Sequence, residues 1–126
     1  MTAAITGLHH AQITIPEGAE EAGRAFYCGL LGLPEIPKPL ALAGRGGFWL
    51  QVGALQVHIG TEAGVAREMT KAHLAYAVAD VMAWCERLAA AGFAPLDGIP
   101  LPGYDRFECC DPFGNRLEFI GPRAEG

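Results

Sequence analysis

The feature that most constrains the fold of this chain is an internal repeat of structural elements. The first half has an alternating apolar and polar segment at 8–15, typical of a strand, followed by a helical pattern from about 17 to 32. Three extended stretches follow, near 39–43, 47–52 and 54–59. The second half has the same order, with a strand at 73–78, a helical pattern between Asp80 and Gly92, and extended stretches near 94–99, 104–110 and 115–120. Such a repeat predicts two modules of one architecture.

The length fits this plan within one domain of the α+β class. A chain of 126 residues is long enough for a single hydrophobic core, and 51% of its residues are hydrophobic. We therefore expect one domain over 1–126, with a first βαβββ module at about 7–60, a linker at 61–71 and a second βαβββ module at about 72–121.

Strand parity places four polar side chains on the face away from the predicted helices. In the first strand, for example, Ala11, Ile13 and Ile15 form the apolar set, which leaves His10 on the opposite face. The four residues selected in this way are His10, His58, His73 and Glu118. They occupy equivalent places in the two halves, because His10 aligns with His73 and His58 with Glu118.

These four side chains predict a metal site if the two faces meet. An uncompensated cluster of imidazoles and a carboxylate would be unfavourable to bury, and a divalent cation removes that penalty. Such ligands suit Zn, Ni, Mn or Fe(II). His10, His73 and Glu118 form a two-histidine, one-carboxylate set, while His58 is either a fourth ligand or a base beside the metal. The alternative for any one strand histidine is a solvated or hydrogen-bonded side chain.

The charge and hydropathy of the sequence limit which partners the protein can bind and in which cellular compartment we expect it. The formal net charge is −5 and no run of Lys and Arg occurs, so neither nucleic acid nor an anionic membrane surface is expected as a partner. No secretory pattern opens the chain, and no segment reaches the ~18 apolar residues of a membrane span. We expect a cytoplasmic protein whose four cysteines stay reduced.

Several of these segments together resemble the vicinal oxygen chelate superfamily, also called the glyoxalase, bleomycin resistance and extradiol dioxygenase fold. The resemblance rests on His10-Ala11-Gln12-Ile13, on Arg24-Ala25-Phe26-Tyr27 with Leu30-Leu31-Gly32-Leu33, on His73, and on the block from Asp111 to Phe119. It implies a curled mixed sheet around a central cavity that holds a metal at the four positions named above. It also implies a homodimer, sometimes with the site shared between chains.

The chemistry implied by the resemblance is the binding of a small substrate, through its oxygens, to a Lewis-acidic metal. Glyoxalase I has Glu or Gln where His58 stands, so Glu118 is the only carboxylate ligand expected here. We therefore expect Glu118 and His58 to be the catalytic residues of a glyoxalase-like lyase or isomerase. An Fe(II)-dependent dioxygenase is a second hypothesis, and a non-catalytic ligand- or drug-binding protein of the bleomycin resistance kind is a third.

Three further side chains are candidates for contact with a substrate. Tyr104 and Arg106 lie in a stretch flanked by Gly and Pro and could orient an anionic group, although Arg106 could equally be a surface or ion-paired residue. Trp49 could line a pocket, with packing in the core as its alternative.

Overall fold

The computed structural model describes residues 2–96 and 98–124 and has the α+β class that the repeat predicts. The chain divides into two compact units, Met1–Val65 and Ala66–Gly126, and each is considered by itself. The elements of the first are β1 (His10–Ile15), α1 (Glu20–Arg24), η1 (Ala25–Leu30), β2 (Glu35–Ile36), η2 (Leu40–Arg45), β3 (Phe48–Val52) and β4 (Leu55–Thr61). Those of the second are η3 (Arg67–Met69), β5 (His73–Ala77), α2 (Val81–Ala90), β6 (Tyr104–Cys110) and β7 (Arg116–Pro122).

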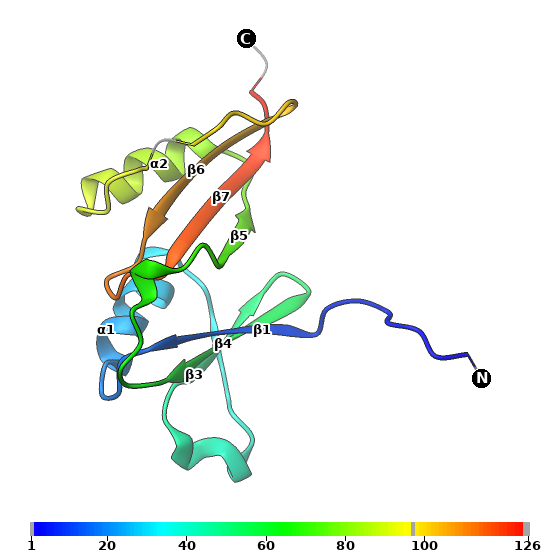
Figure 1. The fold of residues 1–126 in the computed structure, drawn as a ribbon, viewed down its shortest axis with the longest axis vertical. Coiled ribbons are helices and arrows are strands. Elements are labelled where there is room, and N and C mark those ends of the chain that lie inside the picture. The colour runs from blue at the N-terminus through cyan, green and yellow to red at the C-terminus, as the bar shows by residue number, and fades with distance from the viewer. Residues whose placement is uncertain (1, 97, 125–126) are drawn as a thin grey trace. The chain divides into compact units, whose positions relative to one another are not determined.

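The first unit is a four-stranded mixed sheet in the order β1-β4-β3-β2, with β1 parallel to β4 (Figure 1). One continuous helical segment covers it, because α1 passes directly into the π-helical turn η1. Gly23 lies so close to the sheet that a Cβ there would be 3.0 Å from side-chain atoms of Ile15 and Phe48. The glycine therefore lets the helix pack tightly on β1 and β3.

The second unit is a three-stranded mixed sheet in the order β5-β7-β6, with α2 in contact with β6 and β7 (Figure 1). Asp80 caps α2, since its carboxylate accepts a hydrogen bond from the Ala83 N–H at 3.0 Å. The helix ends before Gly92, which has φ +92°. Beneath it, Phe119 stacks with Tyr76 and Trp84 in the core.

Two of the expected extended stretches are not strands. The stretch at 39–43 falls in the 3-10 helix η2, and the short β2 lies earlier, at Glu35–Ile36. Pro39 begins η2 and the glycines after it favour a turn over a strand. The stretch at 94–99 makes only an isolated bridge, from Leu96 to Glu108, and its residue 97 lies outside the described residues. Prolines at 95 and 100 lack the N–H that a ladder requires.

The four cysteines are free thiols. Among the helices of the described residues, none has the length and apolar content needed to cross a membrane.

Candidate metal centre

The two predicted ligands of the first unit, His10 and His58, lie on adjacent strands. In the parallel pairing of β1 with β4, Gln12 is opposite His58, so His10 is offset from His58 by two residues along the sheet. Their rings stack with centroids 4.1 Å apart. Trp49, opposite His58 on β3, stacks on the other side of the same imidazole at 3.7 Å. His58 is therefore held between an indole and a second imidazole.

The His58 ring is buried, with 6% of the residue exposed, whereas His10 is exposed. Burial, followed by the nearby imidazoles of His10 and His9, lowers the pKa of His58. His58 Nε2 lies 2.9 Å from the amide oxygen of Gln56, which accepts its proton. The ring is thus an uncharged imidazole whose other nitrogen has a lone pair available for a proton or a cation.

The two predicted ligands of the second unit, His73 and Glu118, are related in the same way. Ala75 is opposite Glu118 in the parallel pairing of β5 with β7, so His73 is again offset by two residues. The aligned pairs of the two halves therefore share a register as well as a sequence position. His73 Nε2 and Glu118 Oε1 are 3.0 Å apart.

The orientation of the His73 ring is suited to metal binding. Its Nδ1 donates to the carbonyl oxygen of Lys71 at 2.9 Å, which leaves Nε2 directed at the Glu118 carboxylate. A backbone carbonyl on one ring nitrogen is one of the usual ways in which a protein fixes a metal-binding imidazole. Without a cation, a proton on Nε2 fills the same position, and the Lys71 hydrogen bond together with Glu118 raises the pKa of His73 against the effect of burial.

Three charged residues of the second unit surround this pair. Arg106 donates from Nε to Glu118 Oε2 at 3.0 Å, and this contact, followed by that of His73, lowers the pKa of Glu118. Glu108 lies 3.7 Å from His73 Nε2 and 3.6 Å from Arg106 Nη2. Arg116 is 4.0 Å from the other Glu108 oxygen. Arg106 is therefore ion-paired, which is the alternative that the sequence left open for it.

Glu108 was not among the residues predicted from the sequence. It pairs directly with Glu118 across β6 and β7, and His73, Glu108 and Glu118 each offer a ligand atom within 4.8 Å of the others. The Asp111 carboxylate sets this register, because it accepts from the N–H groups of Phe113 and Asn115 in the tight turn between the strands. Counting back from that turn would have paired the two glutamates. Two carboxylates and one imidazole form a donor set that fits a divalent cation.

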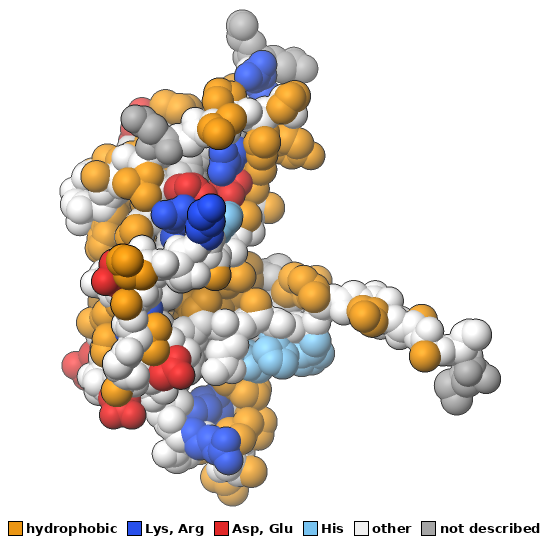
Figure 2. Space-filling model, viewed as in Figure 1, with side chains coloured by type: hydrophobic (Ala, Val, Ile, Leu, Met, Phe, Trp, Pro, Cys, Tyr) orange, Lys and Arg blue, Asp and Glu red, His pale blue; other side chains and the backbone are white. Residues whose placement is uncertain are grey.

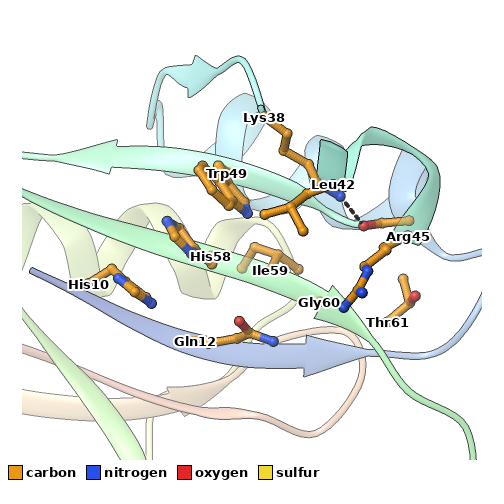
Figure 3. Close-up of a pocket in the computed structure, with 11 residues that line it drawn as sticks. His10, Gln12, Lys38, Leu42, Arg45, Trp49, His58, Ile59, Gly60 and Thr61 are labelled. Atoms are coloured by element: carbon orange, nitrogen blue, oxygen red, sulfur yellow. Dashed lines mark hydrogen bonds between the residues drawn. The ribbon is translucent and has the colours of Figure 1, made fainter. Parts of the chain in front are cut away.

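A pocket of about 470 Å³ opens in the first unit next to the stacked rings. Figure 3 shows His10 and His58 at one end and Arg45 with Thr61 at the other. Trp49 is part of its lining. Tyr104, a predicted substrate contact in the second unit, is 51% exposed on β6.

The four predicted ligands thus form two close pairs, His10 with His58 and His73 with Glu118, one in each unit.

Comparison with known proteins places the fold. The chain matches the Glyoxalase/Bleomycin resistance protein/Dioxygenase superfamily over residues 7–119. A solved structure from Bacillus anthracis, assigned to the glyoxalase family, is 38% identical, with a TM-score of 0.88 over 98% of this chain and 100% of that one. No match is found among curated proteins.

Two more distant structures share the fold. A variant of the fosfomycin resistance protein FosX from Listeria monocytogenes, in complex with Mn(II) and 1S,2S-dihydroxypropylphosphonic acid, is 19% identical, with a TM-score of 0.78 over 95% of each chain. Lactoylglutathione lyase from Agrobacterium tumefaciens is 16% identical, with a TM-score of 0.72 over 94% of this chain and 96% of that one. The match over 7–119 and the 38% identity lead to one conclusion: the chain belongs to the glyoxalase, bleomycin resistance protein and dioxygenase superfamily.

Proposed function

We propose that this protein is a metal-dependent lyase or isomerase of the glyoxalase kind, acting on a small oxygenated substrate. The observation that carries the proposal is the geometry of His73, whose Nδ1 is held by a backbone carbonyl while its Nε2 faces Glu118 Oε1 at 3.0 Å. An imidazole oriented in this way next to a carboxylate is ready to exchange its shared proton for a cation. The Mn(II) in the FosX structure of the same fold supports this reading.

Each residue of the two pairs has a role in the proposal. In the proposal, His73 and Glu118 hold the cation together with His10, the ligand set that the sequence predicts, and Glu108 is an additional carboxylate beside His73 and Glu118. The cation, when bound, supplies Lewis-acid stabilisation of negative charge on substrate oxygens. His58 moves a proton, since an uncharged ring fixed between Trp49 and His10 carries one on one nitrogen and accepts one on the other. Arg106 fixes the Glu118 carboxylate through a 3.0 Å bond to Oε2 and a longer 3.4 Å bond to Oε1, the oxygen that faces His73 Nε2 and takes the cation or a proton in the proposal.

The first test is elemental analysis of protein purified without a chelator, comparing Glu118→Gln with Glu35→Gln. The two glutamates are matched, because Arg24 donates to both Glu35 oxygens at 2.8 and 3.3 Å, much as Arg106 donates to Glu118 at 3.0 and 3.4 Å. We expect near-stoichiometric Zn, Ni, Mn or Fe in wild type and in Glu35→Gln, and a loss of most of it in Glu118→Gln. Equal metal in all three proteins would refute the site.

The proposal extends to a cytoplasmic homodimer, in which the two pairs belong either to one chain or to two. Mixing His10→Ala with Glu118→Ala subunits separates these arrangements. In a shared site, a mixed dimer combines the intact His10 of one subunit with the intact Glu118 of the other, so metal binding returns to about a quarter of the sites. If each site lies within one chain, the mixture binds no more metal than the separate variants.

The reaction class has its own test. A lyase or isomerase needs no oxygen, so turnover under nitrogen should equal turnover in air. Activity that requires both oxygen and ferrous iron would instead identify a dioxygenase.

A further inference from the structure

The pocket of the first unit differs in charge from the rest of the molecule. The chain has a formal net charge of −5, yet Lys38 and Arg45 line this pocket and no Asp or Glu of the described residues does. Figure 2 shows blue basic side chains near the pale-blue histidines on this unit. Two cations and no acid among the described lining residues favour an anionic ligand in this pocket, with the Glu20 carboxylate near Gly46 as a partial offset to their charge.

Lys38 and Arg45 differ in the hydrogen bonds that they make within the protein. Lys38 Nζ donates to the carbonyl oxygen of Gly46 at 2.6 Å, so it fastens the end of η2 and keeps its other N–H donors (Figure 3). Arg45 makes no hydrogen bond or ion pair with any residue in 2–96 or 98–124. A guanidinium offers a planar fork that matches a carboxylate, phosphonate or phosphate. Arg45 is therefore a free anion-binding group at the pocket wall.

The backbone beside Arg45 is built to bring it close to β4. Gly46 has φ +76°, and a Cβ there would lie 2.9 Å from the Thr61 hydroxyl oxygen. Only glycine allows this approach, which puts Arg45 next to Thr61 at the end of the pocket opposite the stacked imidazoles (Figure 3). The hydroxyl of Thr61 adds a neutral donor to the same end.

The remaining lining limits the size and shape of the ligand. Leu42, Trp49 and Ile59 provide apolar surface between the two polar ends. A volume of about 470 Å³ is in the lower part of the range for small-molecule sites, which is about 300 to 1,000 Å³. The occupant is thus a small molecule with a short apolar middle.

From these observations we propose that Arg45, assisted by Lys38, binds an anionic group of the substrate, a carboxylate, phosphonate or phosphate, while the opposite end of the substrate reaches His10 and His58. The assignment of the anion to a substrate rests on the proposed function. Anion binding by the pocket does not, because every group that it uses belongs to the first unit.

The test is an NMR titration of the metal-free full-length protein, in the presence of chelator, with methylphosphonate, acetate and the neutral acetamide. The readout is the backbone amide shifts of Gly46, Gly60 and Thr61. We expect both anions to shift these amides and acetamide to leave them unchanged. The tighter of the two anions identifies the group that the substrate carries.

Substitutions assign the binding to Arg45. Arg45→Gln should weaken methylphosphonate binding about tenfold or more, which corresponds to the loss of one charge-assisted hydrogen-bonded contact. Arg45→Lys should have an intermediate effect, because it keeps the charge and loses the fork. Arg123→Gln removes an exposed charge outside the pocket and should bind like wild type.

Two results would overturn the inference: unchanged methylphosphonate binding by Arg45→Gln, or acetamide binding as tight as that of the anions. The titration contains no metal, so its result does not depend on whether the metal proposal is correct. Anion binding that disappears in Arg45→Gln, together with equal metal contents in wild type and Glu118→Gln, would leave the anion site standing and reject the metal site.

Discussion

Gly47 offers a quantitative test of how the pocket wall is built. It has φ +79°, and a Cβ at this position would overlap the carbonyl oxygen of Ile59 while lying 3.2 Å from Gly60 Cα. These neighbours are backbone of β4, so no side-chain rotation can relieve the overlap. Gly47→Ala must therefore displace the start of β3, where Phe48 pairs with Ile59.

The expected loss of stability can be built from its parts. A non-glycine residue at positive φ costs about 1–2 kcal/mol. Losing one or two hydrogen bonds where β3 starts costs about 1 kcal/mol each. The reduced entropy of the unfolded chain offsets roughly 0.4–1 kcal/mol. The net expectation is a loss of about 1–3.5 kcal/mol in the free energy of unfolding.

Gly44→Ala is the matched control. Gly44 lies three residues away in η2, has no positive φ, and a Cβ there would meet nothing within 4 Å. This variant should be unchanged or up to ~1 kcal/mol more stable than wild type. Urea unfolding followed by circular dichroism compares the three proteins. Equal stability of Gly47→Ala and Gly44→Ala would refute the close approach of β3 and β4 described here.

Three further predictions concern the second unit. Asp111→Ala leaves the Phe113 and Asn115 N–H groups without their acceptor, and it should lower the free energy of unfolding by about 2–4 kcal/mol in urea unfolding; a loss below ~1 kcal/mol would contradict the role of the turn. Burial raises the pKa of Cys109 to about 12 from the ordinary 9.0, so the folded chain holds this proton after the unfolded chain has released it. The contribution of this thiol to the free energy of unfolding is therefore complete below pH 9 and declines above pH 9 by at most ~1.4 kcal/mol per pH unit. Between pH 8 and pH 10, urea unfolding should show a smaller loss of stability for Cys109→Ala than for wild type. Equal losses in the two proteins would refute the prediction. Arg106→Gln leaves Glu108 and Glu118 facing each other without the guanidinium that pairs with both. Relative to wild type, the melting temperature of this variant should fall more in chelator than in saturating Mn²⁺. An equal fall under both conditions would argue against a metal at these carboxylates.

The FosX and lactoylglutathione lyase structures share the fold at under 20% identity, so chemistry has to be argued from this chain's own side chains. The side chains available for that argument include the imidazole of His58, stacked on Trp49, and the basic pocket beside it. Both belong to the first unit, whereas the paired carboxylates Glu108 and Glu118 belong to the second. The metal analysis and the anion titration therefore address the two sets of residues separately.

The sequence by itself determined the α+β class, the order of strand, helix and further strands shared by the two halves, and the face of each strand that carries polar groups. These properties depend on local periodicity and on end signals such as Asp80 and Gly92, which are readable along the chain. Strand parity alone was enough to assign His10 and Ile13 to opposite faces of the first strand, and Glu118 and Phe119 to opposite faces of the last.

Only the tertiary structure decided which of those side chains meet. Register between strands is set by contacts distant in sequence and by turn geometry, so parity could select Glu118 without revealing that Glu108 lies opposite it. Proline-bounded segments were misjudged at 39–43 and 94–99, because extended patterns there have no ladder to join. The free guanidinium of Arg45 follows from a glycine turn packed against Thr61, a long-range approach that no local pattern records.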